Sequence, residues 1–255
     1  IAACRMCEVE VEGMDRLVAS CNNPVEEGMR IHTNTPRVLE ARKANMELLL
    51  SKHDTSCTSC LRSGNCVLQS LSESLNTKEI PFDIEPKYEE WEDDFPLVRN
   101  SAKCIKCGRC VAICDKVQNI GAWKFSSTGL IEVNGLGKLS ETDCSLCGQC
   151  ITHCPVGALT ARDDTAKVLA AIKDPAKKTA VQIAPAVRTA WAEHLGLDPQ
   201  DASPERMATA LRQIGFDYVF DTDWAADLTI MEEGSEFVDR LTKHLGGQEQ
   251  QFPMF

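Results

Sequence analysis

Two cysteine runs between Cys104 and Pro155 constrain this chain more than any other feature. Each run follows the pattern C-x2-C-x2-C-x3-C, with cysteines at 104, 107, 110 and 114 in the first and at 144, 147, 150 and 154 in the second. Two intervening residues let a tight turn direct three thiolates to one face of a cubane, while the fourth Cys, on the following helix, points away. The sequence therefore predicts two [4Fe-4S] clusters.

The spacing also assigns the ligands, because the fourth Cys of each run reaches the other cluster, as in bacterial-type ferredoxins. One predicted cluster takes Cys104, Cys107, Cys110 and Cys154. The other takes Cys144, Cys147, Cys150 and Cys114. Gly108 and Gly148 follow the second Cys of each run, where the missing Cβ lets the backbone approach inorganic sulfide. Disulfides and zinc are the alternatives, but zinc prefers two ligand pairs to four-Cys runs.

Length and cysteine distribution indicate an intracellular metalloprotein. The chain has 255 residues, enough for two ordinary domains, and cofactors allow smaller ones. All 14 cysteines lie between Cys4 and Cys154, mostly in C-x2-C groups typical of metal binding. No apolar run is long enough to span a bilayer, and the start lacks a signal-peptide pattern. We expect a soluble protein in the cytoplasm, where reducing conditions suit exposed clusters.

The negative charge is concentrated in one stretch. The formal net charge is -11, and residues 79–95 hold eight acids against one Lys. We expect a solvated acidic linker here, with a docking strip for a basic partner as the alternative. The acidity argues against nucleic-acid binding, which needs a basic face.

The first segment predicts a partial [2Fe-2S] site on a small hairpin. Residues 8–12 and 17–20 are short strands on either side of Gly13. Plant-type ferredoxins hold their cluster in a loop before such a strand, so Cys4, Cys7 and Cys21 are the candidate ligands, and a fourth Cys would precede Ile1. A three-Cys zinc site or free thiols are the alternatives.

A second candidate site follows a predicted helix over residues 35–53. Thr35 is a plausible N-cap with Pro36 at the first helical position, and His53 lies at the expected C-terminal end. The set His53, Cys57, Cys60 and Cys66 offers four soft ligands, and a [4Fe-4S] cluster is the favoured occupant. Zinc is the main alternative, and a lone His that only complements the helix dipole is another.

The remaining segments add a hairpin and an incomplete α/β domain. Within the insertion 115–143, a hairpin forms around 127–129, and its aromatic residues are interpreted as packing. Residues 178–183 and 216–220 are strands, and 187–195, 204–214 and 227–245 are helices. The order strand, helix, helix, strand, helix is typical of the beginning of an α/β domain.

We therefore predict an α+β multidomain chain. Its expected parts are a partial [2Fe-2S] plant-ferredoxin-like domain at 1–34, a cluster domain with one His and three Cys ligands at 35–78 and an acidic linker at 79–100. A 2[4Fe-4S] ferredoxin domain at 101–165 and the start of an α/β domain at 166–255 follow. The absent initiator Met and the ending at Phe255 lead us to expect part of a longer polypeptide.

The combination of these segments resembles the multi-cluster [FeFe]-hydrogenases, or iron-only hydrogenases. The resemblance rests on the cysteine segments already described and on motifs in the last segment, at 184–188, 215–221, 225–234 and 252–255. The cysteine segments also resemble the large peripheral iron–sulfur subunit of respiratory complex I. The last segment separates the two families, because it looks like the opening of the H-cluster domain.

The resemblance implies roles for several residues of the last segment. Ala184, Pro185 and Ala186 would line the pocket above the catalytic H-cluster. Glu233 and Glu236 would belong to a proton path with Arg240 near its outer end, although an ordinary solvated acidic face is the plain alternative. The H-cluster cysteines of the family would follow Phe255, so the chain as given is expected to lack the catalytic cluster.

The functional prediction is an electron-relay region of an iron hydrogenase, with three [4Fe-4S] clusters and one [2Fe-2S] cluster. The resemblance implies a redox partner, either a ferredoxin or a flavin- and iron–sulfur-containing NAD(P)H diaphorase subunit, in a hetero-oligomer. Ala186, in place of a hydroxyl residue, is similar to the NAD(P)-linked, electron-bifurcating members. The alternatives are a non-catalytic electron-transfer subunit resembling that of complex I, and a zinc-stapled interaction protein.

Overall fold

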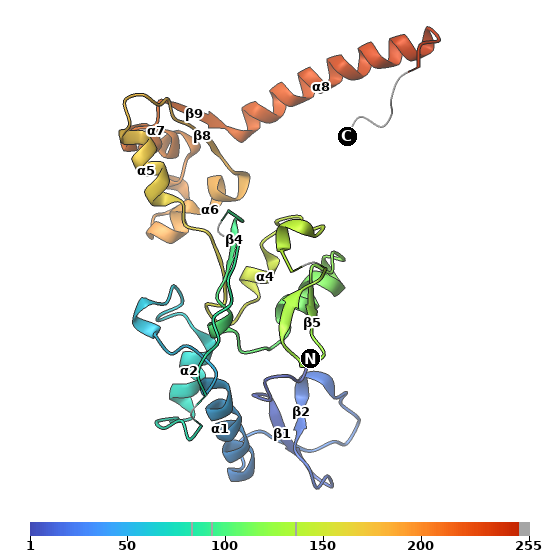
Figure 1. Cartoon of the computed structure of the whole chain (residues 1–255), viewed down its shortest axis with the longest axis vertical. Helices are drawn as coiled ribbons and strands as arrows, with labels where there is room; N and C mark the ends of the chain where they lie inside the picture. The colour runs from blue at the N-terminus through green and yellow to red at the C-terminus, as the bar shows by residue number, and fades with distance from the viewer. Residues whose placement is uncertain (83, 93, 136, 250–255) are drawn as a thin grey trace. The chain divides into compact units, whose positions relative to one another are not determined.

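A computed structural model describes residues 1–249 apart from 83, 93 and 136 (Figure 1). The chain divides into two compact units, one from Ile1 to Arg162 and the other from Asp163 onward. The Phe252-Pro-Met-Phe255 motif lies outside the described residues. None of the helices in the described part combines the length and hydrophobicity needed to cross a bilayer.

The first unit begins with a three-stranded sheet in the order β2-β1-β3. Its strands are β1 (Glu8–Val11), β2 (Val18–Ala19) and β3 (Ile31–His32). The predicted hairpin is confirmed, since β1 and β2 pair antiparallel with Val9 opposite Val18. Val9 and Val11 are buried and alternate with half-buried glutamates, as expected when successive side chains point to opposite faces.

Helix α1 (Pro36–Leu50) begins where the sequence predicts, but it ends earlier. The Thr35 hydroxyl accepts a hydrogen bond from the Val38 N–H at 3.3 Å, which confirms the N-cap. The prediction that the helix reaches His53 is wrong. After Leu50 the chain turns away, and the Asp54 N–H donates to the Ala102 carbonyl at 2.8 Å. Because of this contact with a distant segment, His53 lies in the turn that follows the helix.

The cysteine runs lie on matching turns followed by short helices. These helices are α3 (Arg109–Ala112) and α4 (Gln149–Thr152), and a longer helix, α2 (Val67–Ser74), follows Cys66. Gly108 and Gly148 both adopt the left-handed conformation, at φ 72° and 71°, which glycine tolerates without strain. Lys106 and Leu146, two positions earlier, share it at 55° and 57°. The backbone therefore repeats in both runs.

Two further strand pairs complete this unit. The predicted hairpin is confirmed as β5 (Trp123–Phe125) paired antiparallel with β6 (Ile131–Val133). Strands β4 (Leu97–Arg99) and β7 (Leu159–Ala161) also pair antiparallel and bring the two ends of the cysteine region together. The hydrophobic core includes buried cysteines of both runs, together with Trp123, Leu139 and Val156.

Part of the acidic stretch is packed rather than solvated. The Trp91 indole N–H donates to the Leu97 carbonyl at 2.7 Å, and its ring stacks on Trp123. The Glu92 carboxylate accepts hydrogen bonds from the N–H groups of Leu139 and Ser140 at 2.6 and 3.3 Å. The expectation of a solvated linker is therefore wrong at these two positions. Residues 83 and 93 of the stretch lie outside the described residues.

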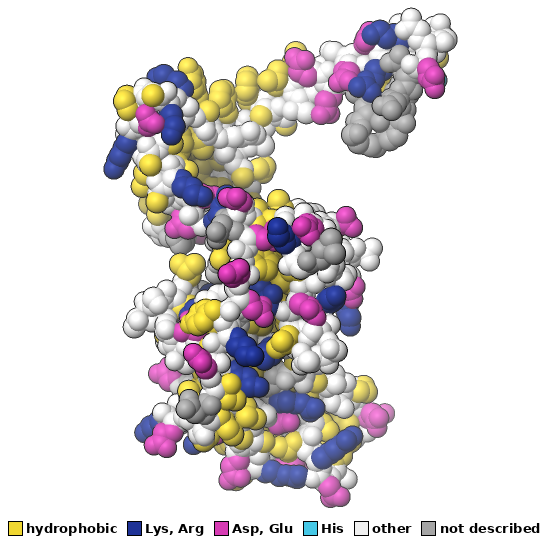
Figure 2. Space-filling model, viewed as in Figure 1, with side chains coloured by type: hydrophobic (Ala, Val, Ile, Leu, Met, Phe, Trp, Pro, Cys, Tyr) yellow, Lys and Arg dark blue, Asp and Glu magenta, His cyan; other side chains and the backbone are white. Residues whose placement is uncertain are grey.

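The second unit has a two-stranded parallel sheet with helices between and after its strands. Its elements are α5 (Thr165–Lys173), β8 (Ala180–Ile183), α6 (Pro185–Leu195), α7 (Pro204–Ile214), β9 (Tyr218–Asp221) and α8 (Thr222–Leu245). The predicted order is confirmed, whereas α6 and α8 begin earlier than expected and α5 was not predicted. Within this unit α8 extends well beyond the sheet (Figure 1), and Figure 2 shows hydrophobic side chains along it.

Candidate iron–sulfur sites

The first site is a cavity within the Cys104–Pro155 region. It is lined by four cysteines, together with Arg99, Gly108, Trp123 and apolar side chains; the cysteines are Cys104, Cys107, Cys110 and Cys154. Burial, reinforced by the Cys104 and Cys107 thiols, raises the pKa of Cys110 to about 12. Burial also raises the pKa of Cys104 and Cys107, and Cys154 adds to both effects. Such neighbouring thiols become thiolates together only when a cationic group balances their charge.

The second site repeats this arrangement. Its cavity is lined by Cys114, Cys144, Cys147 and Cys150. Burial raises the pKa of Cys150 to about 11, a hydrogen bond from Trp123 opposes this, and the other three thiols reinforce the increase. In both sites the structure brings together three cysteines of one run and the last cysteine of the other. These are the sets that the spacing assigns to single clusters.

The geometry of both sites fits a group larger than one ion. In the described part of the chain, no three His, Cys, Asp or Glu side chains converge closely enough to hold a single metal ion. Instead the thiols surround a cavity, and backbone N–H groups face some of them. The Lys106 N–H donates to Cys104 at 3.4 Å, and the Ala122 N–H donates to Cys114 at 3.3 Å. The donor set is that of a thiolate-held iron–sulfur cluster.

The third candidate set lies in the turn between α1 and α2. His53 is buried, and among the described residues its Nδ1 atom has no hydrogen-bond partner. Burial lowers the pKa of His53, with Lys103 acting in the same direction, so the neutral, metal-binding form of the ring is favoured. Cys57 is exposed, whereas Cys60 and Cys66 are half-buried. A buried neutral imidazole, whose Nδ1 has no partner in the described part of the chain, fits a ligand set with the three cysteines that follow it in sequence.

Lys103 and Asp54 form a buried ion pair beside this set, with Nζ and Oδ2 3.1 Å apart. Burial opposes the charge of Lys103, but the hydrogen bond to Asp54 and the thiols of Cys60 and Cys57 outweigh it and raise the pKa of Lys103. A permanent cation therefore faces the cysteines of this site. The sequence carries no signal for this, because Lys103 follows Asp54 by 49 positions.

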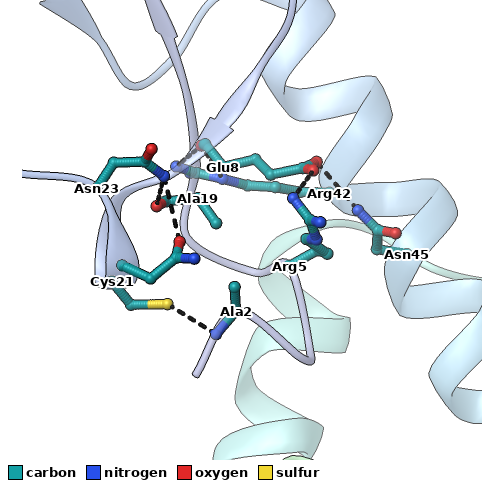
Figure 3. Close-up of polar contacts among 9 residues, drawn as sticks. Ala2, Arg5, Glu8, Ala19, Cys21, Asn23, Arg42 and Asn45 are labelled. Atoms are coloured by element: carbon teal, nitrogen blue, oxygen red, sulfur yellow. Dashed lines mark hydrogen bonds and ion pairs between the residues drawn. The ribbon is translucent and has the colours of Figure 1, made fainter.

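The first segment holds the remaining three cysteines. Cys21 accepts a hydrogen bond from the Ala2 N–H at 3.2 Å (Figure 3), and a hydrogen bond with Cys7 lowers its pKa. Cys4 is half-buried in the same loop. Nearby, the Glu8 carbonyl accepts two hydrogen bonds from Arg42 of α1, at 3.1 and 2.6 Å (Figure 3). The cysteine loop is thereby tied to α1.

The predicted catalytic residues lie in the second unit. Ala184 is the N-cap of α6, and Pro185 and Ala186 open that helix; all three are exposed. Glu233 and Glu236 are exposed on α8, and Arg240 forms an ion pair with Glu236 one turn away. The helix places the two glutamates on one face, as the spacing predicts.

Comparisons with known proteins agree with this arrangement. Residues 177–255 match the family described as "Iron only hydrogenase large subunit, C-terminal domain". Residues 1–36 match a 2Fe-2S iron-sulfur cluster binding domain. Residues 42–81 match an NADH-ubiquinone oxidoreductase-G iron-sulfur binding region, and residues 103–158 match a 4Fe-4S dicluster domain. The chain resembles the iron–sulfur part of an iron-only hydrogenase, joined to the start of its hydrogenase domain. The [FeFe]-hydrogenase resemblance inferred from the motifs is thus confirmed.

Two curated hydrogenase relatives align over nearly the whole chain. NADP-reducing hydrogenase subunit HndD of Solidesulfovibrio fructosivorans is 46% identical over 250 residues, covering 96% of this chain and 43% of the relative. Iron hydrogenase 1 of Clostridium pasteurianum is 36% identical over 260 residues, covering 100% of this chain and 44% of the relative. The chain therefore spans less than half the length of either hydrogenase.

Other relatives align with a smaller share of the chain. The 78 kDa mitochondrial protein of NADH-ubiquinone oxidoreductase from Candida albicans (strain SC5314) is 37% identical over 164 residues, covering 62% of this chain and 22% of the relative. A crystal structure of NAD+-reducing [NiFe]-hydrogenase in the H2-reduced state has a TM-score of 0.58 and 26% identity, covering 64% of this chain and 70% of that one. The iron-only hydrogenase match covers residues 177–255 of this chain.

Proposed function

We propose that this chain is the electron-relay region of an iron-only hydrogenase, alternatively described as an [FeFe]-hydrogenase. The observation that carries the proposal is the pairing of two four-cysteine cavities, each built from three cysteines of one run and one of the other. The fourteen cysteines and His53 would hold three [4Fe-4S] clusters and one [2Fe-2S] cluster, the last with a ligand from outside this sequence. When bound, such clusters accept and release single electrons.

The residues around the cavities supply what these groups require. Buried thiols are costly to ionise alone. Four of them close together therefore favour a bound cationic iron–sulfur core over four free thiols. Backbone N–H groups stabilise the thiolates, and apolar side chains around the sites keep water away. Both factors act on the redox potential of a held cluster.

The packing supports an order for the relay. The 57–66 loop contacts the turn that begins at Cys154, through a hydrogen bond from Arg62 to the Cys154 carbonyl. The His53 set therefore neighbours the Cys104 set, which in turn shares Trp123 with the Cys144 set. We propose that electrons pass between these three sites in that order, with the Cys4 segment on the entry side.

The parent protein would interconvert protons and hydrogen at an H-cluster held by residues beyond this sequence. The match over 177–255 and the two hydrogenase relatives support this. Ala184, Pro185 and Ala186 would form part of the pocket wall, and Glu233, Glu236 and Arg240 would carry protons. The exposed face of α8 is available to be covered by further chain, which would bury the two glutamates.

The proposed partner is a flavin- and iron–sulfur-containing NAD(P)H diaphorase subunit in a hetero-oligomer, with a ferredoxin as the other candidate. The name of one relative, an NADP-reducing hydrogenase subunit, supports the first. Ala186 supports it as well. The proposal is tested by measuring whether the purified complex couples hydrogen turnover to NAD(P). Hydrogen turnover that uses ferredoxin but not NAD(P) would contradict it.

The cluster proposal is tested by anaerobic purification followed by iron, sulfide and zinc analysis with EPR. We expect iron and sulfide sufficient for three four-iron clusters and one two-iron cluster, and one signal that changes in His53→Cys. A zinc-replete, EPR-silent His53 set would contradict the cluster assignment there. A colourless protein with zinc in place of iron would favour the zinc-stapled interaction protein instead.

A non-catalytic electron-transfer subunit resembling complex I is the second candidate. The match of residues 42–81 to the NADH-ubiquinone oxidoreductase-G region favours it. The full-length protein distinguishes the two candidate functions. A hydrogenase evolves hydrogen from protons when a reduced low-potential dye supplies the electrons. Cluster reduction without hydrogen evolution, in a protein matured with its H-cluster machinery, would support the electron-transfer subunit.

A further inference from the structure

Arg99 is a buried cation in the wall of one of the two four-cysteine sites. Only 11% of its side chain is exposed, and it lines the cavity of the Cys104 set. Among the described residues that line this cavity, it is the one charged residue apart from the cysteines. The described lining of the Cys144 cavity includes no Lys, Arg, Asp or Glu. The two sites, whose backbone turns match, therefore differ in charge.

The β4–β7 ladder explains why the charge lies at one site only. Arg99 pairs with Leu159, and both residues line the cavity of the first site. Leu97 pairs with Ala161 at the other end of the ladder, and both line the cavity of the second site. Residues two apart on a strand lie on the same face, about 6–7 Å apart along it. The same face of β4 thus brings an apolar residue to one site and a cation to the other.

Aromatic and polar contacts hold the guanidinium of Arg99 in place. Its central carbon lies 5.7 Å from the Trp123 ring centroid and 5.9 Å from that of Trp91, within the range of cation–π contact. The guanidinium also donates a hydrogen bond to the Ile131 carbonyl. Trp123 and Ile131 line the same cavity, so the charge is fixed against its wall.

The carboxylate that pairs with Arg99 cancels only part of this charge. Glu89 Oε2 lies 3.3 Å from a guanidinium nitrogen, but Glu89 is not among the described residues that line the cavity. Its side chain is 54% exposed, so water screens the anion more than it screens the buried cation. Arginine stays charged at any working pH, since its pKa lies above about 12. A net positive field therefore reaches the first site.

We propose that Arg99 raises the redox potential of a cluster in the first site relative to that of a cluster in the second. The inference rests on the proposed function, since it requires clusters in both cavities. Reduction adds one negative charge to a cluster, and a fixed cation nearby stabilises the reduced form. This effect falls with distance, so it is larger at the cavity that Arg99 lines. The first site is the middle one in the proposed relay order, so Arg99 favours residence of the electron there.

The test is Arg99→Gln in the full cluster-loaded protein, followed by an EPR-monitored redox titration. Glutamine keeps a hydrogen-bond donor but carries no charge. We expect about a tenfold fall in the reduced-to-oxidised ratio of one four-iron cluster at fixed potential, equivalent to about 59 mV for a one-electron couple. The shifts of the other clusters should be smaller. Cys107→Ser and Cys147→Ser, which each alter one site, assign the affected signal to the first or the second site.

Arg99→Lys separates the charge from the packing. Lysine keeps the positive charge but loses the planar guanidinium that contacts both rings. The potential should therefore stay closer to the wild-type value in Arg99→Lys than in Arg99→Gln. An equal fall in the two variants would assign the effect to packing and overturn the inference. Intact clusters in Arg99→Gln with unchanged potentials, or with equal shifts in both sites, would overturn it as well.

Glu89→Gln makes a prediction of opposite sign and does not depend on the folding of an Arg99 variant. It removes the paired anion and leaves more of the positive charge unbalanced, so the potential of the same cluster should rise. Glu90→Gln is the matched control, because it removes the same charge from an exposed neighbouring position. No rise in Glu89→Gln, or an equal rise in both variants, would contradict the inference. Iron analysis separates the two failures, because a wild type without two four-iron clusters over 103–158 defeats the proposed function itself.

Discussion

The guanidinium of Arg62 donates a hydrogen bond to the carbonyl oxygen of Cys154 at 2.8 Å, across 92 positions of sequence. The bond ties the loop of the His53 set to the turn that closes the first four-cysteine site. The bond is part-buried, and the loss of such a charge-assisted bond costs about 1.5–3 kcal/mol.

Arg62→Ala should therefore loosen the 57–66 loop without unfolding the unit. We expect faster amide hydrogen exchange in this loop, with α8 unchanged, and faster loss of one cluster to an iron chelator. Arg16→Ala, which changes an exposed arginine of the first segment, serves as the control. Equal exchange rates in Arg62→Ala and wild type would show that the bond does not hold the loop.

Gly157 makes a second contact between the same two segments. A Cβ added there would lie 2.8 Å from the Cys60 sulfur, closer than real Cβ contacts allow. A free cysteine side chain could rotate away, but a ligating sulfur is fixed in place.

Gly157→Ala should therefore selectively disturb the His53 site. We expect reduced occupancy or an altered EPR signal of one four-iron cluster, with the other clusters retained. Gly234→Ala is the control, because that glycine is helical and an added Cβ meets nothing within 4 Å. Full occupancy and unaltered spectra in Gly157→Ala would argue against Cys60 as a fixed ligand.

The buried pair of Lys103 and Asp54 supports a prediction on stability. Lys103→Met leaves the part-buried Asp54 carboxylate without its cation, and the loss of such a charge-assisted hydrogen bond costs about 1.5–3 kcal/mol. We expect a lower urea midpoint for the loss of cluster absorbance. The double variant Lys103→Met with Asp54→Asn should recover much of this loss, since no charge is then left unpaired. A double variant no more stable than Lys103→Met alone would contradict the coupling.

Local sequence signals predicted the local elements well. Thr35 and Pro36 mark the start of α1, and the hairpins of the first segment and of the insertion form where alternating residues flank a glycine. The grouping of cysteines in the two cavities also follows from spacing, because the two runs repeat the same backbone turn.

Features that depend on distant partners could not be predicted in this way. The end of α1 is set by a bond from Asp54 to Ala102, and β4 pairs with β7 across the whole cysteine region. Composition marked Trp91 and Glu92 as part of a linker, because their partners lie beyond the first cysteine run. Trp123 packs in the core as predicted, but its stacking partner Trp91 lies before the first cysteine run, so no local signal identifies that partner.

Glu92 supports a prediction that tests this packed part of the acidic stretch. Burial raises its pKa, but hydrogen bonds from Ser140 and from the Leu139 and Ser140 N–H groups outweigh this and lower it overall. Glu92→Ala should leave these donors without their partner, at a cost of about 1–3 kcal/mol. Amide exchange at Leu139 and Ser140 should accelerate. The exposed neighbour Glu90→Ala should not change it, and protection retained in Glu92→Ala would contradict the role.

The proton-path proposal makes a prediction for the full-length enzyme. Glu233 and Glu236 share a face of α8, and the ion pair with Arg240 holds Glu236 in position. Burial of this face by further chain would enclose the two carboxyl groups, as a proton path separated from bulk water requires. Glu233→Ala should then abolish hydrogen turnover while the iron–sulfur clusters are still reduced normally.

The adjacent Glu232 provides the control for this prediction. It is also exposed, but one residue along a helix turns its side chain about 100° away from Glu233. Hydrogen evolution with a reduced dye should therefore persist in Glu232→Ala and disappear in Glu233→Ala, with cluster reduction equal in both by EPR. Wild-type turnover in Glu233→Ala would assign these carboxylates to the ordinary solvated face of a helix. Loss of turnover in both variants would point to the overall negative charge of the face, rather than to a path through Glu233.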